Sequence, residues 1–259
     1  MTERKVVVKN LEVNYKIVGE GLPAQAGRPF LILHGWGSKS DRWEKTAELL
    51  SKKGMQVVIP DLPGFGKSQE PDIAWNLNTY VEWLAEFCTK IPELNNNFYL
   101  LGHSFGGALS AKFSIKYNQK VQKLFLVGAA AIRKKTIKKQ VLGRVSKLSK
   151  IFSFVPFYPL AKKAFYKFVV GGNDYLRAQG VMKETFLQVI SDDLSQFLSS
   201  IKVPTVIIWG DKDDTTLVED AYFIQKKILH STLSIIPGGD HDLEVKVPEL
   251  LAEKILENI

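Results

Sequence analysis

One segment constrains the fold of this 259-residue chain more than any other, because residues 100–107 read Leu-Leu-Gly-His-Ser-Phe-Gly-Gly. An apolar run leads into the pattern Gly-x-Ser-x-Gly, and helix-compatible residues follow it directly. A sharp turn from a strand into a helix brings backbones close together, and glycine at Gly102 and Gly106 removes the Cβ that would clash. The segment therefore predicts a buried strand, a strained turn that exposes Ser104, and a helix whose free N–H groups point at the same spot.

The rest of the chain alternates apolar runs with amphipathic segments. Such alternation predicts right-handed crossovers and an α/β fold, with a mostly parallel eight-stranded sheet covered by helices on both faces. Strands are expected over residues 6–8, 11–18, 29–33, 55–59, 97–101, 121–127, 203–209 and 233–236, and helices over 41–53, 77–90, 108–116, 218–228 and 247–256.

Residues 132–201 interrupt this alternation, because they contain no strand-like run and resemble several short helices. We predict a helical cap at 132–201, inserted into a core domain formed by residues 1–131 and 202–259. The cap is expected to close over the carboxyl edge of the sheet. A chain of this length accommodates one α/β domain with such an insertion.

The net charge of +8 is unevenly distributed along the sequence. Residues 95–172 contain no Asp or Glu but fifteen Lys and Arg, eleven of them within 133–167. This basic part of the cap is interpreted as a solvated face, with attraction of an acidic carrier protein or an anionic lipid as the alternative. Aromatic residues alternate with the basic ones, but they are more typical of a pocket wall, and no nucleic-acid partner is expected.

Several further features narrow the class of protein. The single cysteine, Cys88, cannot form an internal disulfide, no apolar stretch follows the basic N-terminal residues, and no apolar run reaches the length of a membrane-spanning helix. These features together predict a cytoplasmic protein. The spacing of His and Cys indicates no metal site. Residues 64–68 faintly resemble a phosphate loop, but Asp61 stands where that loop requires glycine, so no cofactor is expected.

A serine hydroxyl becomes a good nucleophile only when a base accepts its proton, and the base needs a carboxylate to orient it. The chain has four histidines. His34 and His103 lie in tight glycine-flanked turns, and His230 precedes a strand at the opposite end of the sheet. His241 follows the last predicted strand, at the carboxyl edge where open α/β sheets build their sites, so it is the expected base.

The carboxylate is expected directly after the preceding strand, where Asp211, Asp213 and Asp214 are all candidates. Position alone does not separate these three. The order serine, acid, histidine along the chain agrees with that of one class of hydrolases. Two backbone N–H groups would stabilise an oxyanion, one from Phe105 and one from Trp36, which leaves both side chains free to line an acyl pocket.

These motifs closely resemble those of the α/β-hydrolase superfamily, in particular its serine carboxylesterases. The pattern Trp-Gly-x-x-Asp of that superfamily places the acid on Asp213. The first two motifs also resemble the pimeloyl-acyl-carrier-protein methyl ester esterase group. That group usually has Trp and Leu where this chain has His103 and Phe105, so its substrate is not carried over. Thr215 and its neighbours stand where a proline often follows the acid. The matching motifs are His-Gly-Trp-Gly at 34–37, Asp-Leu-Pro-Gly-Phe-Gly-Lys-Ser at 61–68, Gly-His-Ser-Phe-Gly-Gly at 102–107, Trp-Gly-Asp-Lys-Asp at 209–213 and Gly-Asp-His at 239–241.

The sequence therefore predicts an enzyme without cofactor, which hydrolyses a carboxylic ester or thioester through an acyl-enzyme on Ser104. His241 would act as the base and Asp213 would orient it. Two alternatives stay open at this point. The same three residues serve C–C bond hydrolases of this fold, and a non-catalytic ligand receptor could retain the fold as well.

Overall fold

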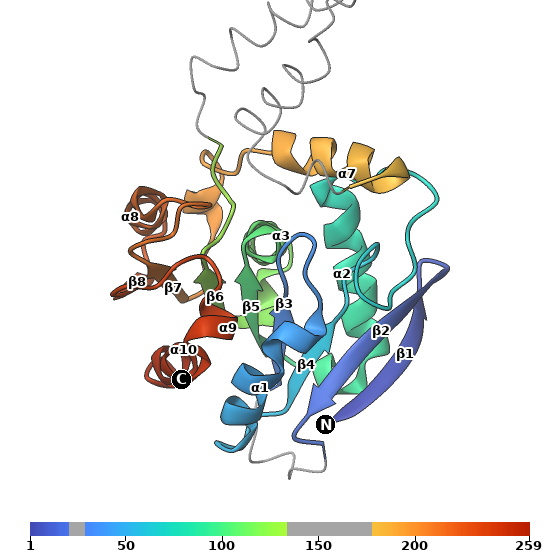
Figure 1. The fold of residues 1–259 in the computed structure, drawn as a ribbon, viewed down its shortest axis with the longest axis horizontal. Coiled ribbons are helices and arrows are strands. Elements are labelled where there is room, and N and C mark those ends of the chain that lie inside the picture. The colour runs from blue at the N-terminus through green and yellow to red at the C-terminus, as the bar shows by residue number, and fades with distance from the viewer. Residues whose placement is uncertain (21–28, 134–177) are drawn as a thin grey trace, which may run out of the picture.

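The computed structural model describes residues 1–20, 29–133 and 178–259 of the chain. Within them, one eight-stranded sheet runs in the order β1-β2-β4-β3-β5-β6-β7-β8 (Figure 1). The strands are β1 Thr2–Val8, β2 Leu11–Val18, β3 Phe30–Leu33, β4 Val57–Pro60, β5 Phe98–His103, β6 Val121–Val127, β7 Thr205–Gly210 and β8 Ser231–Ile236.

The sheet is mostly parallel. Strand β2 pairs antiparallel with both β1 and β4, whereas every pair from β4 to β8 is parallel. The predicted fold class, a mostly parallel eight-stranded sheet with helices on both faces, is thereby confirmed.

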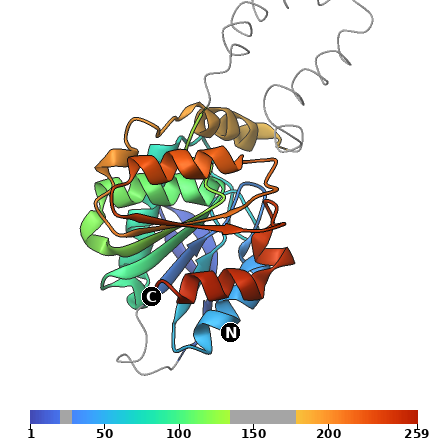
Figure 2. The ribbon, with the colours of Figure 1, turned by 90° about the vertical axis from the view of Figure 1, so that its left-hand side faces the viewer.

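Two hydrophobic cores lie on opposite faces of the sheet, because successive strand residues point to opposite sides. In β3, Leu31 and Leu33 belong to the core beneath α2, α3 and α8, while Phe30 and Ile32 belong to the core beneath α1 and α10. Figure 2 shows the sheet between these two helical layers. The helices are α1 Glu44–Ser51, α2 Leu77–Lys90, α3 Phe105–Lys116, α7 Gly180–Ser191, α8 Val218–Lys227, α9 Leu243–Lys246 and α10 Pro248–Leu256, with short 3₁₀ turns η1 Ser40–Trp43, η2 Pro92–Leu94, η3 Asn118–Lys120 and η4 Leu198–Ser200.

The chain changes direction at the centre of the sheet. From β3 it passes through α1 to β4 on one side, whereas from β5 it passes through α3 to β6 on the other. In open α/β sheets, ligands bind in the crevice beyond the carboxyl ends of the strands at such a switch point. The loops that follow β3 and β5 are therefore the parts of the fold that can hold a substrate.

Some predicted boundaries were wrong. Strand β1 begins at Thr2 rather than at residue 6, because an edge strand tolerates exposed charges, and Glu3 and Lys5 pair with residues of β2. The helix predicted over 41–53 is divided into η1 and α1. Strand β5 continues two residues beyond its predicted end, through His103, so it reaches the turn at Ser104 directly.

The predicted cap, residues 132–201, is described only in part. Residues 134–177, which carry most of its basic side chains, lie outside the described residues. Helix α7 and turn η4 belong to the described remainder, and α7 lies above α2 and α3 in Figure 1. The Trp75 N–H donates to Thr185 of α7 at 3.0 Å, which fixes this helix against the core. None of the helices in the described ranges is long and apolar enough to cross a membrane.

Candidate active site

The turn between β5 and α3 holds Ser104 in a strained conformation, with φ 51° and ψ −115°. Such a φ is rare outside glycine and is tolerated only where surrounding structure fixes it. A Cβ on Gly102 would lie 2.1 Å from the carbonyl oxygen of Gly106, and a Cβ on Gly106 would lie 2.2 Å from that of Leu33. Both glycines are therefore required for the close approach that the sequence predicted.

Asp213 and His241 form a pair in the loops that follow β7 and β8, with Asp213 buried and His241 partly exposed. The Nδ1–H of His241 donates to Oδ2 of Asp213 at 2.7 Å, and the side chain of Asp213 is 1% exposed. The backbone N–H groups of Thr215 and Thr216 donate to Oδ1 at 2.9 and 2.8 Å, and the Thr216 hydroxyl donates to Oδ2 at 2.8 Å. Burial raises the pKa of Asp213, but hydrogen bonds from His241 and Thr216 outweigh it and hold this pKa below its usual value.

This arrangement shows which of the three candidate acids contacts His241. Asp211 accepts the N–H of Gly238 at 2.6 Å and is exposed, and Asp214 is also exposed. Asp213 is the acid bonded to His241. Because Nδ1 of His241 carries the shared proton, its Nε2 keeps a lone pair that can accept another.

Ser104 and His241 line the same cavity, which has a volume of about 1100 Å³. No hydrogen bond joins these two described side chains directly. Hydrogen bonds between a nucleophile and its base are often long in a free site and shorten when substrate binds. In the structure, Asp213 and His241 are thus in direct contact, whereas Ser104 and His241 line the same cavity without a hydrogen bond between them.

Gly128, at the end of β6, makes room for the acid–histidine pair. Its φ is 49°, and a Cβ there would lie 3.2 Å from Oδ2 of Asp213 and 3.3 Å from Nδ1 of His241. The Thr216 hydroxyl also lies 3.1 Å from the carbonyl oxygen of Gly128. Sequence reasoning missed the roles of Gly128 and Thr216, and only the missing proline near 215 drew attention to that loop.

The two predicted oxyanion donors lie on adjacent segments: Trp36 is in the loop after β3, and Phe105 is the first residue of α3. Within the described part of the chain, the backbone N–H groups of Trp36 and Phe105 donate to no acceptor. A Cβ built on Gly35 would lie 3.2 Å from Cβ of Ser104, so the loop after β3 lies directly against the serine turn. Both N–H groups are therefore free to bind an anionic oxygen near Ser104.

His34 fixes the loop that carries Trp36. Its Nδ1–H donates to the carbonyl oxygen of Gly35 at 2.8 Å, and its Nε2 accepts the N–H of Leu62 at 2.9 Å. Burial lowers the pKa of His34 to about 4, so this ring is neutral near pH 7. Sequence reasoning had set His34 aside as the base, but its supporting role between two loops was not predicted.

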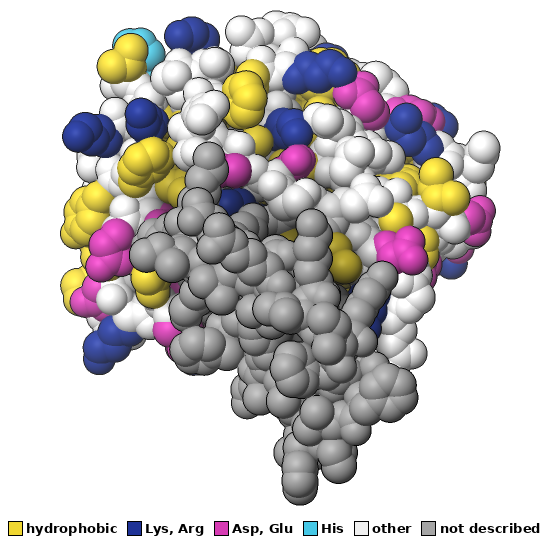
Figure 3. Space-filling model, turned by 90° about the horizontal axis from the view of Figure 1, so that it is seen from above, with side chains coloured by type: hydrophobic (Ala, Val, Ile, Leu, Met, Phe, Trp, Pro, Cys, Tyr) yellow, Lys and Arg dark blue, Asp and Glu magenta, His cyan; other side chains and the backbone are white. Residues whose placement is uncertain are grey.

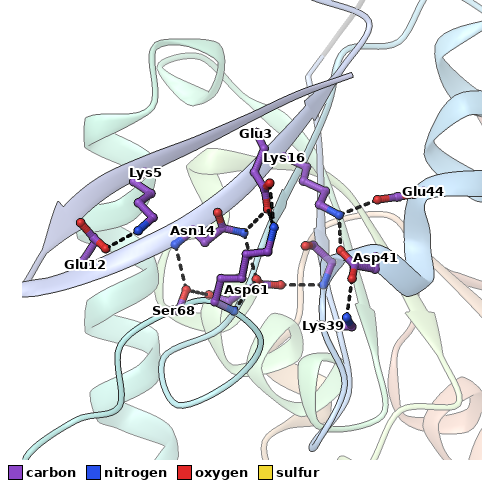
Figure 4. Close-up of polar contacts among 12 residues, drawn as sticks. Glu3, Lys5, Glu12, Asn14, Lys16, Lys39, Asp41, Glu44, Asp61 and Ser68 are labelled. Carbon is purple, nitrogen blue, oxygen red and sulfur yellow. Dashed lines mark hydrogen bonds and ion pairs between the residues drawn. The ribbon is translucent and has the colours of Figure 1, made fainter.

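A second anchor for this region is Asp61, the first residue of the 61–68 motif (Figure 4). Its carboxylate accepts the N–H groups of Ser40 at 2.7 Å and Lys67 at 2.9 Å, and the side-chain amide of Asn14 at 3.0 Å. Burial opposes ionisation, but these hydrogen bonds hold the pKa of Asp61 below its usual value. A Cβ on Gly66 would lie 2.3 Å from Cγ of Asp61, so glycine is required there. The motif therefore organises a turn around a carboxylate.

Aromatic side chains form one wall of the cavity. The ring of Trp36 contacts those of Phe65, Phe105 and Phe186 at centroid distances of 4.8, 5.5 and 5.0 Å. Trp36 and Phe65 line the cavity, together with Met182 from α7. The expectation that Phe105 also lines it was wrong: this residue is 3% exposed and belongs to the core, where its ring contacts that of Tyr80.

Other residues that line the cavity are charged. Arg42 donates to Asp242 at 2.6 Å and to the buried Glu244 at 2.8 Å, which ties η1 to the start of α9. Seen from above, Lys, Arg, Asp and Glu side chains are interspersed with hydrophobic ones on the described part of the surface (Figure 3). Among the described residues, no group of three His, Cys, Asp or Glu side chains could hold a metal ion.

The sheet order, the strained serine after β5, and the acid and histidine after β7 and β8 define an α/β-hydrolase. The family described as serine aminopeptidase, S33 matches residues 25–245, and the chain belongs to that family. The protein is therefore an enzyme of the hydrolase class.

Three comparisons show which known proteins the chain is similar to. Lipase 1 of Psychrobacter immobilis is 27% identical over 234 residues, which cover 83% of this chain and 72% of that lipase. The 2-hydroxy-6-oxo-6-(2'-aminophenyl)hexa-2,4-dienoic acid hydrolase of Metapseudomonas resinovorans is 23% identical over 98% of this chain and 89% of its own length. The crystal structure of a membrane phospholipase A, 24% identical, superposes with a TM-score of 0.75 over 99% of this chain and 84% of that one, and it supports the fold.

Proposed function

We propose that this protein is a serine hydrolase that cleaves a carboxylic ester or thioester through an acyl-enzyme. One observation carries the proposal: His241, which is held by a hydrogen bond of 2.7 Å to Asp213, lines the same cavity as Ser104. A buried carboxylate that fixes the tautomer of a histidine beside a strained serine serves nucleophilic catalysis. A receptor without catalysis has no need of this arrangement.

In the proposed reaction, Oγ of Ser104 attacks the carbonyl carbon and its proton passes to Nε2 of His241. The Trp36 and Phe105 N–H groups stabilise the resulting oxyanion. As the tetrahedral intermediate collapses, the C–O or C–S bond breaks and the imidazolium of His241 protonates the departing alcohol or thiol. Water, deprotonated by His241, then attacks the acyl carbon. The bond between this carbon and Oγ of Ser104 breaks, the imidazolium returns its proton to Oγ, and the acid is released. Asp213 stabilises the imidazolium in both steps without becoming protonated.

A fluorophosphonate probe tests this assignment, since it reacts covalently with activated serines. We expect labelling of the wild-type protein and no labelling of Ser104→Ala. Asp213→Asn is expected to fold but to lose turnover of p-nitrophenyl acetate by about 10⁴-fold, because the tautomer of the histidine is no longer fixed. A well-folded wild-type protein that is not labelled would favour the alternative of a ligand receptor.

A second candidate function, hydrolysis of a C–C bond, is favoured by the similarity to the hexadienoic acid hydrolase along 98% of this chain. The two functions share the three residues but differ in the bond that breaks. We expect a panel of p-nitrophenyl esters of increasing acyl length to be turned over faster than a vinylogous diketone that models a ring-cleavage product. The reverse ranking would select the second candidate.

The proposal also covers the size of the substrate, the cellular compartment and the basic residues at 133–167. A small acyl substrate fits the cavity of about 1100 Å³. On the charge of the sequence alone, we propose a cytoplasmic enzyme whose basic residues at 133–167 form a solvated face, with attraction of an acidic carrier protein or an anionic lipid as the alternative.

A further inference from the structure

One buried side chain beside the site has no part in the reaction described above. His103 ends β5, immediately before Ser104, and is 4% exposed. The Nε2 of this ring lies 2.9 Å from the main-chain carbonyl oxygen of His241, a residue 138 positions further along the chain. The two imidazole rings lie 4.7 Å apart at 42°.

The chemistry of the contact fixes the protonation of the His103 ring. A carbonyl oxygen only accepts, so Nε2 of His103 carries the proton and donates it. Burial lowers the pKa of His103, which keeps the ring neutral. In a neutral ring the other nitrogen, Nδ1, carries no proton and cannot donate.

His241 is therefore held at two points. Asp213 holds its side chain through Nδ1, and His103 holds its main chain through the carbonyl oxygen. The main-chain contact connects the turn after β5 to the loop after β8, across the intervening strands β6 and β7. If one of these two contacts were lost, His241 could pivot about the remaining one, and its Nε2 would move relative to Ser104.

The same ring also lies against the loop that carries the first oxyanion donor. A Cβ built on Gly35 would come within 3.1 Å of Nδ1 of His103. The ring also contacts that of Trp43, at a centroid distance of 5.8 Å. The ring of His103 thus lies between the segments that supply the nucleophile, the base and the oxyanion hole.

We propose that His103 is a positioning residue, whose Nε2–H fixes the backbone of His241 and thereby aims the base at Ser104. This role rests on the proposed function of the Ser104 site. It requires a donor at the position of Nε2, and a side chain that merely fills the space does not supply one.

Three variants separate a donor from a space-filling role. The amide nitrogen of glutamine is as many bonds from Cβ as Nε2 of histidine, so His103→Gln can keep the donor. The amide nitrogen of asparagine matches the position of Nδ1, so His103→Asn is equally polar but cannot reach the carbonyl. His103→Leu removes the donor and keeps an apolar side chain.

We expect His103→Leu and His103→Asn to lower kcat for p-nitrophenyl acetate by roughly 10- to 100-fold with KM within about twofold, since small misplacements of reacting groups cost this much. His103→Gln is expected to stay within about threefold of the wild type. The same two impaired variants should also show faster hydrogen exchange over residues 237–242, as measured by mass spectrometry. Thermal unfolding of all three provides the control for folding.

The role is refuted if His103→Leu keeps the kcat of the wild type, or if the glutamine and asparagine variants lose equal activity. Hydrogen exchange keeps this test separate from that of the proposed function. If the wild type neither hydrolyses esters nor reacts with a fluorophosphonate, the proposed function fails. Unchanged exchange over 237–242 in the asparagine variant then still refutes the anchor, and faster exchange supports it.

Discussion

Substitution of Gly128 by alanine tests whether the contact between Asp213 and His241 controls activity. An L-residue at the φ of 49° costs about 1–2 kcal/mol of stability by itself. The added Cβ would lie 3.2 Å from Oδ2 of Asp213 and 3.3 Å from Nδ1 of His241, tighter than ordinary contact. Relief of this contact requires a shift of a few tenths of an ångström. If a misplacement of about 1 Å costs about 100-fold, such a shift costs roughly fourfold in kcat/KM.

Gly180 offers a matched control, because its φ is also 49° and a Cβ there would contact nothing within 4 Å. We expect both alanine variants to lose about 1–2 kcal/mol in urea unfolding. Only Gly128→Ala should lose kcat/KM for p-nitrophenyl acetate. The reasoning is refuted if Gly128→Ala keeps the kcat/KM of the wild type, or if Gly180→Ala loses as much activity.

Three further predictions concern stability and partners. Gly66→Ala should lose about 2–4 kcal/mol in urea unfolding, because its Cβ would overlap the Asp61 carboxylate at 2.3 Å; a loss below about 1 kcal/mol would contradict the carboxylate-centred turn. The native pKa of Asp213 is lowered, so its ionised form stabilises the fold above the unfolded pKa of about 3.9, and this contribution is lost as pH falls through the native pKa. The unfolding free energy of the wild type should therefore fall more steeply below about pH 5 than that of Asp213→Asn, and parallel curves would argue against an ionised buried Asp213. If residues 133–167 attract an acidic carrier protein, turnover of a carrier-bound substrate should decrease with added salt much more than turnover of p-nitrophenyl acetate, and equal salt dependence would exclude that partner.

Much of the fold could be predicted because the signals are local. Apolar runs such as those of β3 and β5 must be buried on both faces, and Gly102 is required by a close approach within its own strand-to-helix turn. Boundaries were harder to predict. The charged residues at the start of β1 give no strand signal, and their pairing with β2 is a property of the edge of the sheet.

The serine, acid and histidine of the site could be predicted from the sequence, but the residues that hold them in place were harder to predict. The acid, the histidine and the serine each follow a strand, which a sequence pattern reveals. The contacts of Thr216 with Asp213, and of His103 with the His241 backbone, depend on how separate loops meet in space. Phe105 shows the same limit, because only the packing of α3 decides that its ring enters the core.

The walls of the cavity have a consequence for substrate choice. The reacting groups sit on loops fixed by the sheet, whereas part of the wall comes from α7, whose Met182 fills the space above Gly64. Part of the wall that contacts the substrate thus lies on a different part of the chain from Ser104, Asp213 and His241. Substitution of side chains along α7 could therefore admit a bulkier acyl group without a change in the loops that carry the reacting groups.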